Sequence, residues 1–281
     1  MKTNIKLKCP ICYSTSKIVL EDRYLNIYRC KSCSHTFTAI LKEEQEKYND
    51  DYYTKKHKNW FKYPNHKLFD FIYNESIRLL DKKPFQLLDV GCGKGDLLKY
   101  IASRDLEANL FGIDLINNSD PRIHFIRGDF LEEKIENKFN IVCSLAVVEH
   151  INNPHLFFQK TRDLLESNGF LFITTVNNNS LLYRISRLLK KLGIRSAYDR
   201  LYFHHHLQHY TNQSLRKLME MNNFDILLQK NHNYSIKMVD VPESSFLIKN
   251  IYKLSVYFIF LLSSPFNSGM LQTIVCKKKN N

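Results

Sequence analysis

The chain has 281 residues, of which 44% are hydrophobic, and it carries a formal net charge of +13. This composition predicts an α/β domain of ordinary size with a small additional module, and it argues against general disorder. The positive charge favours a phosphate-bearing partner, such as a nucleic acid, a nucleotide-linked substrate or an anionic membrane surface. The alternative is a lysine-rich surface with no such role. No secretory signal is recognisable, and the longest apolar run, 254–262, is far shorter than the roughly 20 residues that span a bilayer.

Four of the seven cysteines form two C-x-x-C pairs near the N-terminus. These are Cys9, Cys12, Cys30 and Cys33. Each pair can turn two thiolates toward one cation, and the alternating residues 17–28 predict a hairpin that brings the pairs together. The spacing therefore predicts a structural zinc ribbon over residues 1–45. A redox role for either pair is the alternative. His35 could in principle replace a thiolate, but four thiolates already complete a tetrahedron.

Residues 46–281 predict one larger α/β domain. An aromatic-rich stretch, 51–64, begins it, and we expect this stretch to pack over the domain. From residue 67 helices alternate with strands, which predicts a mostly parallel sheet with helices on both faces. Helices are expected at 67–80, 96–104, 155–167 and 212–221, and strands at 85–89, 109–114, 123–127, 139–144, 169–175, 224–229 and 270–277.

The strand at 85–89 ends in Asp89 and runs into Gly91, Gly93 and Gly95. Such a turn lets the backbone approach a ligand without Cβ clashes, and it leaves helix N-terminal N–H groups facing that ligand. Dinucleotides and S-adenosylmethionine are both bound in this way. In a dinucleotide fingerprint G-x-G-x-x-G, Asp96 would be the third glycine.

The other strand ends carry suitable side chains for the same ligand, because ligands bind beyond the carboxyl ends of parallel strands. Asp114 is placed to accept both ribose hydroxyls, whereas Asp129 and Phe130 could meet the adenine. An Asp at a strand end also caps helices, which is the alternative for each acid. The predicted cofactor residues are Asp89, Gly91, Cys92, Gly93, Gly95, Asp114, Leu115, Asp129, Phe130, Ser144 and Leu145.

Over residues 67–277 these motifs resemble class I S-adenosylmethionine-dependent methyltransferases. The matching segments are 88–96 (LDVGCGKGD), 112–114 (GID), 128–130 (GDF), 144–151 (SLAVVEHI) and 164–171 (LLESNGFL). The resemblance implies a Rossmann-like, seven-stranded, mostly parallel sheet with an antiparallel final strand. It also implies that the glycine turn approaches the methionine moiety while Asp114 holds the ribose.

Within this class the chain is similar to bacterial methyltransferases that carry an N-terminal four-cysteine ribbon and act on sugars and cell-envelope glycans. The shared features are the ribbon, the segment 149–151 (EHI) followed by Pro154, and the segments 174–177 (TTVN) and 206–211 (HLQHYT). The expected acceptor is therefore a sugar, a glycan precursor or another small molecule. An RNA acceptor bound by the ribbon and the basic surface is the second hypothesis, and a non-enzymatic scaffold is the third.

His150 is the candidate catalytic residue, since a near-neutral imidazole beside the sulfonium could take a hydroxyl proton during methyl transfer. The alternative is that His150 caps a loop and shapes the pocket. Quinone O-methyltransferases share Glu-His here but carry a further acid three residues before the Glu, which is linked with metal binding. Ala146 stands at that position and counts against metal assistance. His204, His205, His206 and His209 are interpreted as pocket wall and loop residues.

Two helical stretches, near 181–210 and 245–264, lie where this class inserts substrate-binding segments. The first alternates apolar and basic residues, whereas the second is more apolar. They could pack together as a lid, or rest on an anionic membrane and admit a lipid-linked sugar. We therefore expect a cytoplasmic protein. The alternative is a cytoplasmic protein that also contacts the inner face of the membrane peripherally.

Overall fold

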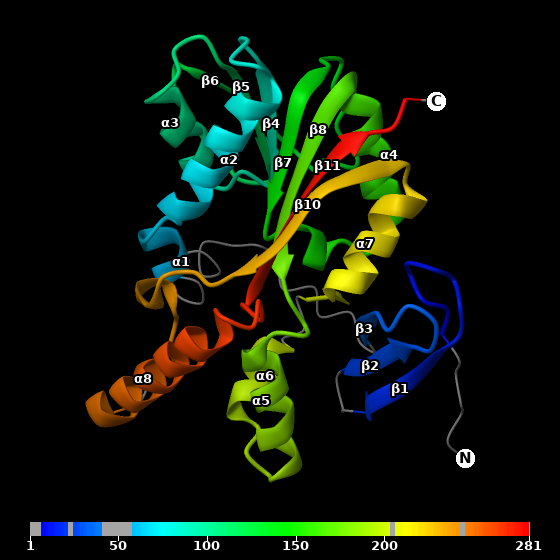
Figure 1. The fold of residues 1–281 in the computed structure, drawn as a ribbon, viewed down its shortest axis with the longest axis vertical. Coiled ribbons are helices and arrows are strands. Elements are labelled where there is room, and N and C mark those ends of the chain that lie inside the picture. The colour runs from blue at the N-terminus through cyan, green and yellow to red at the C-terminus, as the bar shows by residue number, and fades with distance from the viewer. Residues whose placement is uncertain (1–6, 22–24, 41–57, 203–205, 242–244, 281) are drawn as a thin grey trace.

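The computed structural model describes residues 7–21, 25–40, 58–202, 206–241 and 245–280. Its core is a seven-stranded sheet with helices on both faces (Figure 1). In spatial order the strands are β10 (Phe224–His232), β11 (Leu271–Lys278), β8 (Leu165–Val176), β7 (Phe139–Leu145), β4 (Gln86–Val90), β5 (Asn109–Asp114) and β6 (Ile123–Arg127). The last five in this order run parallel, and β11 is antiparallel to both of its neighbours. The predicted fold class is confirmed.

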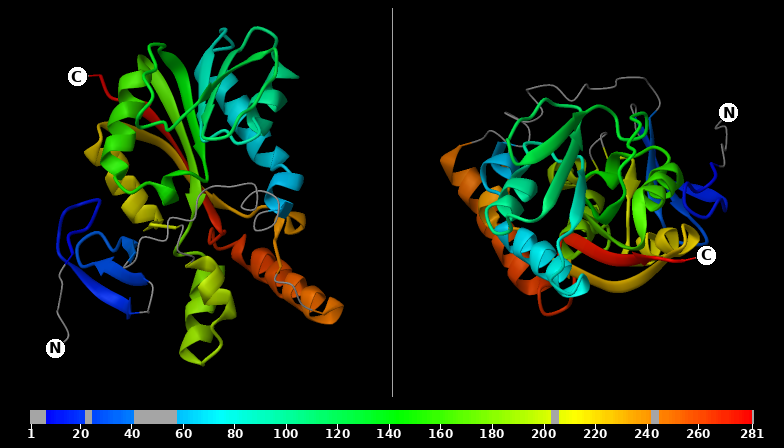
Figure 2. Two further views of the ribbon diagram at one scale, coloured as in Figure 1. Left: turned by 180° about the vertical axis from the view of Figure 1, so that it is seen from behind. Right: turned by 90° about the horizontal axis from the view of Figure 1, so that it is seen from above.

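The parallel strands are apolar on both faces because each face is covered by helices. One layer consists of α2 (His66–Leu79) and α3 (Asp96–Ala102), and the other of α4 (Pro154–Leu164) and α7 (Asn212–Met221) (Figure 2). Helix α7 begins at the predicted residue, because Thr211 and Ser214 form a capping box. Helix α4 ends three residues earlier than predicted, since Leu165 already pairs with Phe139 in the sheet.

The N-terminal module is a small antiparallel sheet in the order β1-β2-β3-β9. Its strands are β1 (Ser16–Glu21), β2 (Leu25–Cys30), β3 (Thr36–Ile40) and β9 (Gln208–His209). The hairpin predicted over 17–28 is confirmed by the pairing of β1 with β2. The fourth strand comes from the large domain, so the two parts share a sheet. The boundary predicted between residues 45 and 46 lies outside the described residues.

His35 connects the module to the large domain. Its ring is fully buried, with Nε2 2.9 Å from Gln208 Oε1 and Nδ1 3.3 Å from Ser214 Oγ. Burial lowers the pKa of His35 to about 4, which keeps the ring neutral at pH 7. Beside it, Thr38 Oγ1 lies 2.8 Å from His209 Nε2. His35 is therefore a buried contact residue between the two parts and not a fifth member of the cysteine group.

The remaining elements gather at the end of the sheet where β8 finishes (Figure 1). They are α1 (Lys58–Lys62), η2 (Val148–His150), α5 (Leu181–Lys191), α6 (Ser196–Leu201), η3 (Ile236–Met238) and α8 (Phe246–Ser263). Helices α5 and α6 lie within the stretch 181–210, and α8 lies within the stretch 245–264, where helices were expected. Helix α8 is longer than the apolar run noted in the sequence, because Ser245 caps its start by accepting from the Ile248 amide. Among the described residues it is the one helix long and apolar enough to cross a membrane, judged by length and composition alone.

Candidate active site

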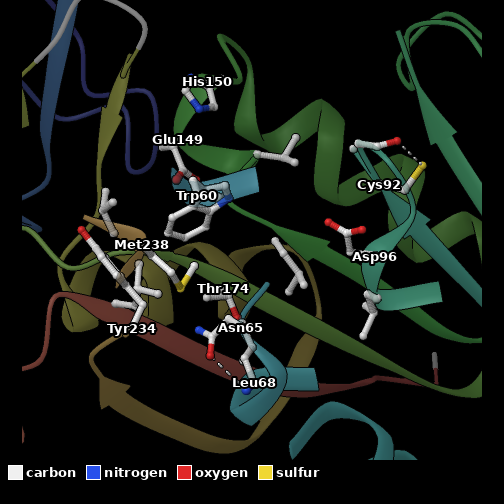
Figure 3. A pocket seen from close by; sticks show the side chains of 18 of the residues that line it. Trp60, Asn65, Leu68, Cys92, Asp96, Glu149, His150, Thr174, Tyr234 and Met238 are labelled. Atoms are coloured by element: carbon white, nitrogen blue, oxygen red, sulfur yellow. Dashed lines mark hydrogen bonds between the residues drawn. The ribbon is translucent and has the colours of Figure 1, made fainter. Parts of the chain in front are cut away.

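A cavity of about 520 Å³ opens at the carboxyl ends of the parallel strands. Figure 3 shows Cys92 and Asp96 on one side of it and Trp60, Tyr234 and Met238 on the other, with Glu149 and His150 above Trp60. The first side is formed by the glycine turn. The second side is formed by α1, η3 and the residues that flank them.

The glycine turn has a backbone that only glycine adopts easily. Gly91, Gly93 and Gly95 all have positive φ, at 72°, 54° and 74°. A Cβ on Gly91 would also lie 2.3 Å from Val147 Cγ2, so this glycine is required for contact with the loop after β7. The turn is therefore fixed both by its own dihedral angles and by its neighbour.

Asp114 holds the turn in place from the next strand. Its Oδ2 accepts from the Gly93 amide at 2.7 Å, and its Oδ1 accepts from the Ile116 amide at 3.2 Å. A carboxylate has about four acceptor positions, so Asp114 can still accept hydroxyl groups from a ribose. The predicted role of Asp114 is thus compatible with its structural one.

Three carboxyl groups, those of Asp89, Asp96 and Asp114, converge on the end of the cavity that the glycine turn forms. Burial, then Asp114 and then Asp96 raise the pKa of Asp89 well above its ordinary value. Burial likewise raises the pKa of Asp96, and Asp89 Oδ1 is buried without a hydrogen-bond partner among the described residues. A cationic ligand reduces the electrostatic repulsion among these carboxyl groups, whereas the pyrophosphate of a dinucleotide is repelled by their negative charge. S-Adenosylmethionine carries an ammonium and a sulfonium, so the residues present fit that cofactor.

Most of the predicted cofactor residues line the cavity. They are Asp89, Gly91, Cys92, Gly93, Asp114, Leu115, Asp129, Phe130 and Leu145. Gly95 and Ser144 are not part of the lining, because Gly95 precedes α3 and packs near Phe125, while Ser144 is fully buried within β7. Phe130 also packs on Phe157 in the core, with ring centroids 5.1 Å apart.

Glu149, His150 and His206 meet at the wall of the cavity. One ligand atom from each lies within 4.8 Å of the others, and the two imidazole centroids are 4.9 Å apart. Glu149 accepts a hydrogen bond from Thr175 Oγ1 at 2.7 Å, and burial raises its pKa to about 7. A carboxyl with that pKa can exchange protons near neutral pH, and the two imidazoles lie within reach of it. The same donors could hold a divalent ion, so Ala146 alone does not exclude metal assistance.

This cluster was only partly predictable from the sequence. His150 was expected to face the acceptor, and it lines the cavity. Glu149 was recognised as part of a motif, but its buried carboxyl was not expected to titrate near pH 7. His206 approaches from a segment 56 residues later in the chain, and no local pattern identifies such a contact. His204 and His205 lie outside the described residues, and His209 is buried against Thr38 instead.

The four N-terminal cysteines come together as predicted. The Sγ atoms of Cys9 and Cys33 are 3.6 Å apart, and Cys12 Sγ lies 3.4 Å from those of both Cys30 and Cys33. Tetrahedral zinc with bonds of about 2.3 Å would set its sulfur ligands about 3.8 Å apart. Backbone amides two residues further on also point at the sulfurs, from Ile11 to Cys9 and from Ser32 to Cys30. These donors stabilise thiolates, so the donor set fits zinc.

The sheet order, the glycine turn and the group of acids at the carboxyl strand ends together define an S-adenosylmethionine-dependent methyltransferase of class I. In agreement with this, residues 61–229 match a family model described as "Methyltransferase domain", and the chain belongs to that family.

Several curated proteins are similar over part of the chain. The ubiquinone biosynthesis O-methyltransferase of Dictyostelium discoideum is 33% identical over 147 residues, which are 42% of this chain and 44% of that protein. The corresponding protein of Rattus norvegicus is 36% identical over 115 residues, covering 35% and 32%. The matches thus span about half the length of these curated relatives or less. Among solved structures, one described as a sarcosine dimethylglycine methyltransferase from Galdieria sulphuraria aligns with a TM-score of 0.50 and 13% sequence identity. The alignment covers 76% of this chain and 86% of that one, and it supports the fold assignment.

Proposed function

We propose that this methyltransferase transfers a methyl group to a hydroxyl oxygen on a small, largely apolar ring compound. The observation that carries the proposal is the lining of the cavity beyond Glu149. Its side chains there are mostly aromatic or aliphatic: Trp60, Leu182, Tyr183, Leu201, Tyr234, Met238, Tyr252, Val256 and Met270. Such a surface favours a flat, apolar acceptor over a strongly hydrated one.

The curated relatives support the same chemistry, since they are O-methyltransferases of ubiquinone biosynthesis. They give no support to the sugar or glycan acceptor expected from the sequence, nor to RNA. A glycan acceptor therefore stays a prediction without further support. Trp60 and Tyr234 could still stack on a sugar ring, so sugar acceptors belong in the assay.

In the proposed reaction, bound S-adenosylmethionine supplies the electrophilic methyl group. His150 takes the proton from the acceptor hydroxyl, which makes the oxygen nucleophilic as the methyl group is transferred. Glu149 and His206 stand within reach of His150 and can share or stabilise that proton. The glycine turn and Asp114 fix the cofactor, and the aromatic wall excludes water from the reacting atoms.

We further propose that Cys9, Cys12, Cys30 and Cys33 hold one structural zinc ion. The ion would join the two ends of the β1–β2 hairpin region and so support the module that shares a sheet with β9. The cytoplasmic location expected from the sequence also stays a proposal. None of these assignments depends on the identity of the acceptor.

The test is release of S-adenosylhomocysteine by the full chain from four acceptor sets: short-tailed catechols and hydroquinols, nucleotide sugars, lipid-linked glycans and ribosomal RNA. We expect turnover with the first set. Turnover confined to sugars, glycans or RNA would overturn the acceptor class. His150→Ala should lower kcat at least about 100-fold with little change in cofactor Kd, because a general base contributes about 10²–10⁴. The matched control is His124→Ala, on an exposed histidine of β6.

A further inference from the structure

Helix α8 exposes an unusually large apolar surface. Only 17% of its 18-residue apolar stretch, Phe246–Ser263, is buried. Its exposed large side chains are Phe246, Leu247, Ile248, Ile251, Leu254, Tyr257, Phe258, Leu261 and Leu262. Leaving so many apolar groups in water is costly, and a continuous patch of this kind marks a surface that is covered in use.

The opposite face of α8 anchors the helix to the domain. Val256, Phe260 and Ser263 are buried, and Asn233 donates hydrogen bonds to the Phe260 carbonyl and to Ser263 Oγ. The strands on either side of α8 in the chain, β10 and β11, are antiparallel neighbours in one sheet. A helix that crossed a bilayer would place these strands on opposite sides of it. Helix α8 must therefore lie along a surface and not through it.

The charged side chains of α5 and α8 themselves are all of one sign. Residues 181–195, which include α5, and residues 245–268, which include α8, contain no Asp or Glu. Their cations are Arg184, Arg187, Lys190, Lys191, Arg195, Lys249 and Lys253. Helices α5 and α8 pack against each other and project from the end of the sheet that carries the cavity (Figure 1). A second copy of the chain on this surface would bring like charges together, whereas an anionic lipid surface complements them.

We propose that α8 and the basic helix α5 form a face that binds anionic lipid bilayers, with α8 lying in the headgroup region. The inner side of the same helices lines the cavity, through Tyr252 and Val256 of α8 and Leu182 of α5. A membrane-bound enzyme would thus present its acceptor end to the bilayer, where an apolar ring compound concentrates. This last step rests on the proposed function, whereas lipid binding itself does not.

Vesicle flotation with the full chain, without cofactor or acceptor, tests the lipid face. We expect binding to vesicles of 30% phosphatidylglycerol in phosphatidylcholine, and much weaker binding to phosphatidylcholine alone. The double variant L254E/F258E should lose at least about 10-fold in partitioning. L106E is the matched control, because Leu106 is 91% exposed in the loop before β5. R184Q/K191Q should weaken binding to the anionic vesicles only. Equal flotation of wild type and L254E/F258E would overturn the proposal.

A second measurement distinguishes lipid from a protein partner. The chain has one tryptophan, Trp60, so F258W in a W60F background reports on α8 alone. Brominated acyl chains should quench this fluorescence. If the protein instead sediments as a dimer that L254E/F258E dissociates, with no quenching, a second copy covers the face and the proposal is wrong. Turnover of a soluble short-tailed acceptor by a variant that cannot bind vesicles would leave the proposed chemistry intact.

Discussion

The charge at the glycine turn leads to a specific prediction for Asp89. Asp89→Asn keeps the shape of the side chain and removes a buried carboxyl whose pKa is raised by burial, Asp114 and Asp96. The free protein should become more stable at pH 7, because a buried carboxylate without a partner is costly. Cofactor affinity should fall, since a hydrogen bond to a charged group contributes about 1.5–3 kcal/mol, equivalent to about 10- to 150-fold in Kd.

The raised pKa of Asp89 also couples cofactor binding to pH. In the free protein this carboxyl keeps its proton to a higher pH than an ordinary aspartic acid. Holding an ammonium requires the carboxylate, so binding releases a proton and the affinity rises as the pH increases toward the free-protein pKa. Asp89→Asn removes this contribution, and the pH dependence of its Kd should be flatter than that of the wild type.

Isothermal titration calorimetry with S-adenosylhomocysteine, which keeps the ammonium, measures both effects. Titrations in two buffers of different ionisation enthalpy count the released protons, and thermal unfolding of the free proteins gives the change in stability. Asp163→Asn, on an exposed acid of α4, is the matched control. If Asp89→Asn binds within twofold of the wild type, or if the variant is less stable than the wild type, the assignment of a cation to this end of the cavity is wrong.

Four further predictions concern Glu149, divalent ions, the glycine turn and the four N-terminal cysteines. Turnover should rise with pH around 7 as the Glu149 carboxyl ionises, and Glu149→Gln should remove this rise. Burial raises the pKa of Glu149 from 4.5 to about 7, so the wild-type protein loses stability as the pH rises through that interval. Glu149→Gln should therefore be more stable than the wild type at pH 8, by up to about 3 kcal/mol in chemical unfolding. Mg²⁺ or Mn²⁺ should change turnover by less than twofold, and strict dependence on either ion would mean that a metal replaces the general base. Gly91→Ala should cost clearly more stability than Gly193→Ala, since both have positive φ but only the first Cβ would meet a neighbour, and equal costs in thermal unfolding would contradict the contact with Val147. The purified chain should hold one zinc ion by mass spectrometry, and Cys30→Ser should lose it and lower the Tm.

The regular part of the fold was predictable because its signals are local. Strands β5 and β6 and helix α7 have the predicted bounds, since apolar strands between polar turns and a Thr211 capping box are visible in a few residues. Strand β9 was not predicted, because two residues carry no periodic pattern and pair only where β3 is already in place. The contact of His206 with Glu149 likewise depends on how distant segments meet.

The exposure of α8 could not be predicted from the sequence, for a different reason. An apolar helical run has the same composition whether it is a core helix or a surface helix. The sequence therefore did not distinguish a helix packed into a lid from a helix in contact with a membrane. The structure leaves most of the apolar side chains of α8 exposed, and this exposure depends on how α8 packs on α5, η3 and Asn233.

The two ends of the cavity differ in a way that suits methyl transfer. The sulfonium charge disappears as the proton leaves the acceptor, so the reacting atoms lose charge on the way to products. A carboxylate beside the sulfonium would stabilise the charged ground state more than the transition state and would slow the reaction, whereas Glu149 beside His150 can stabilise the imidazolium that forms. The acids Asp89, Asp96 and Asp114 instead surround the glycine turn, whereas an apolar wall that includes Trp60 faces the acceptor end. The acids can therefore hold the ammonium and ribose while the methyl group reacts in surroundings of low polarity, which an apolar acceptor entering beside α8 would preserve.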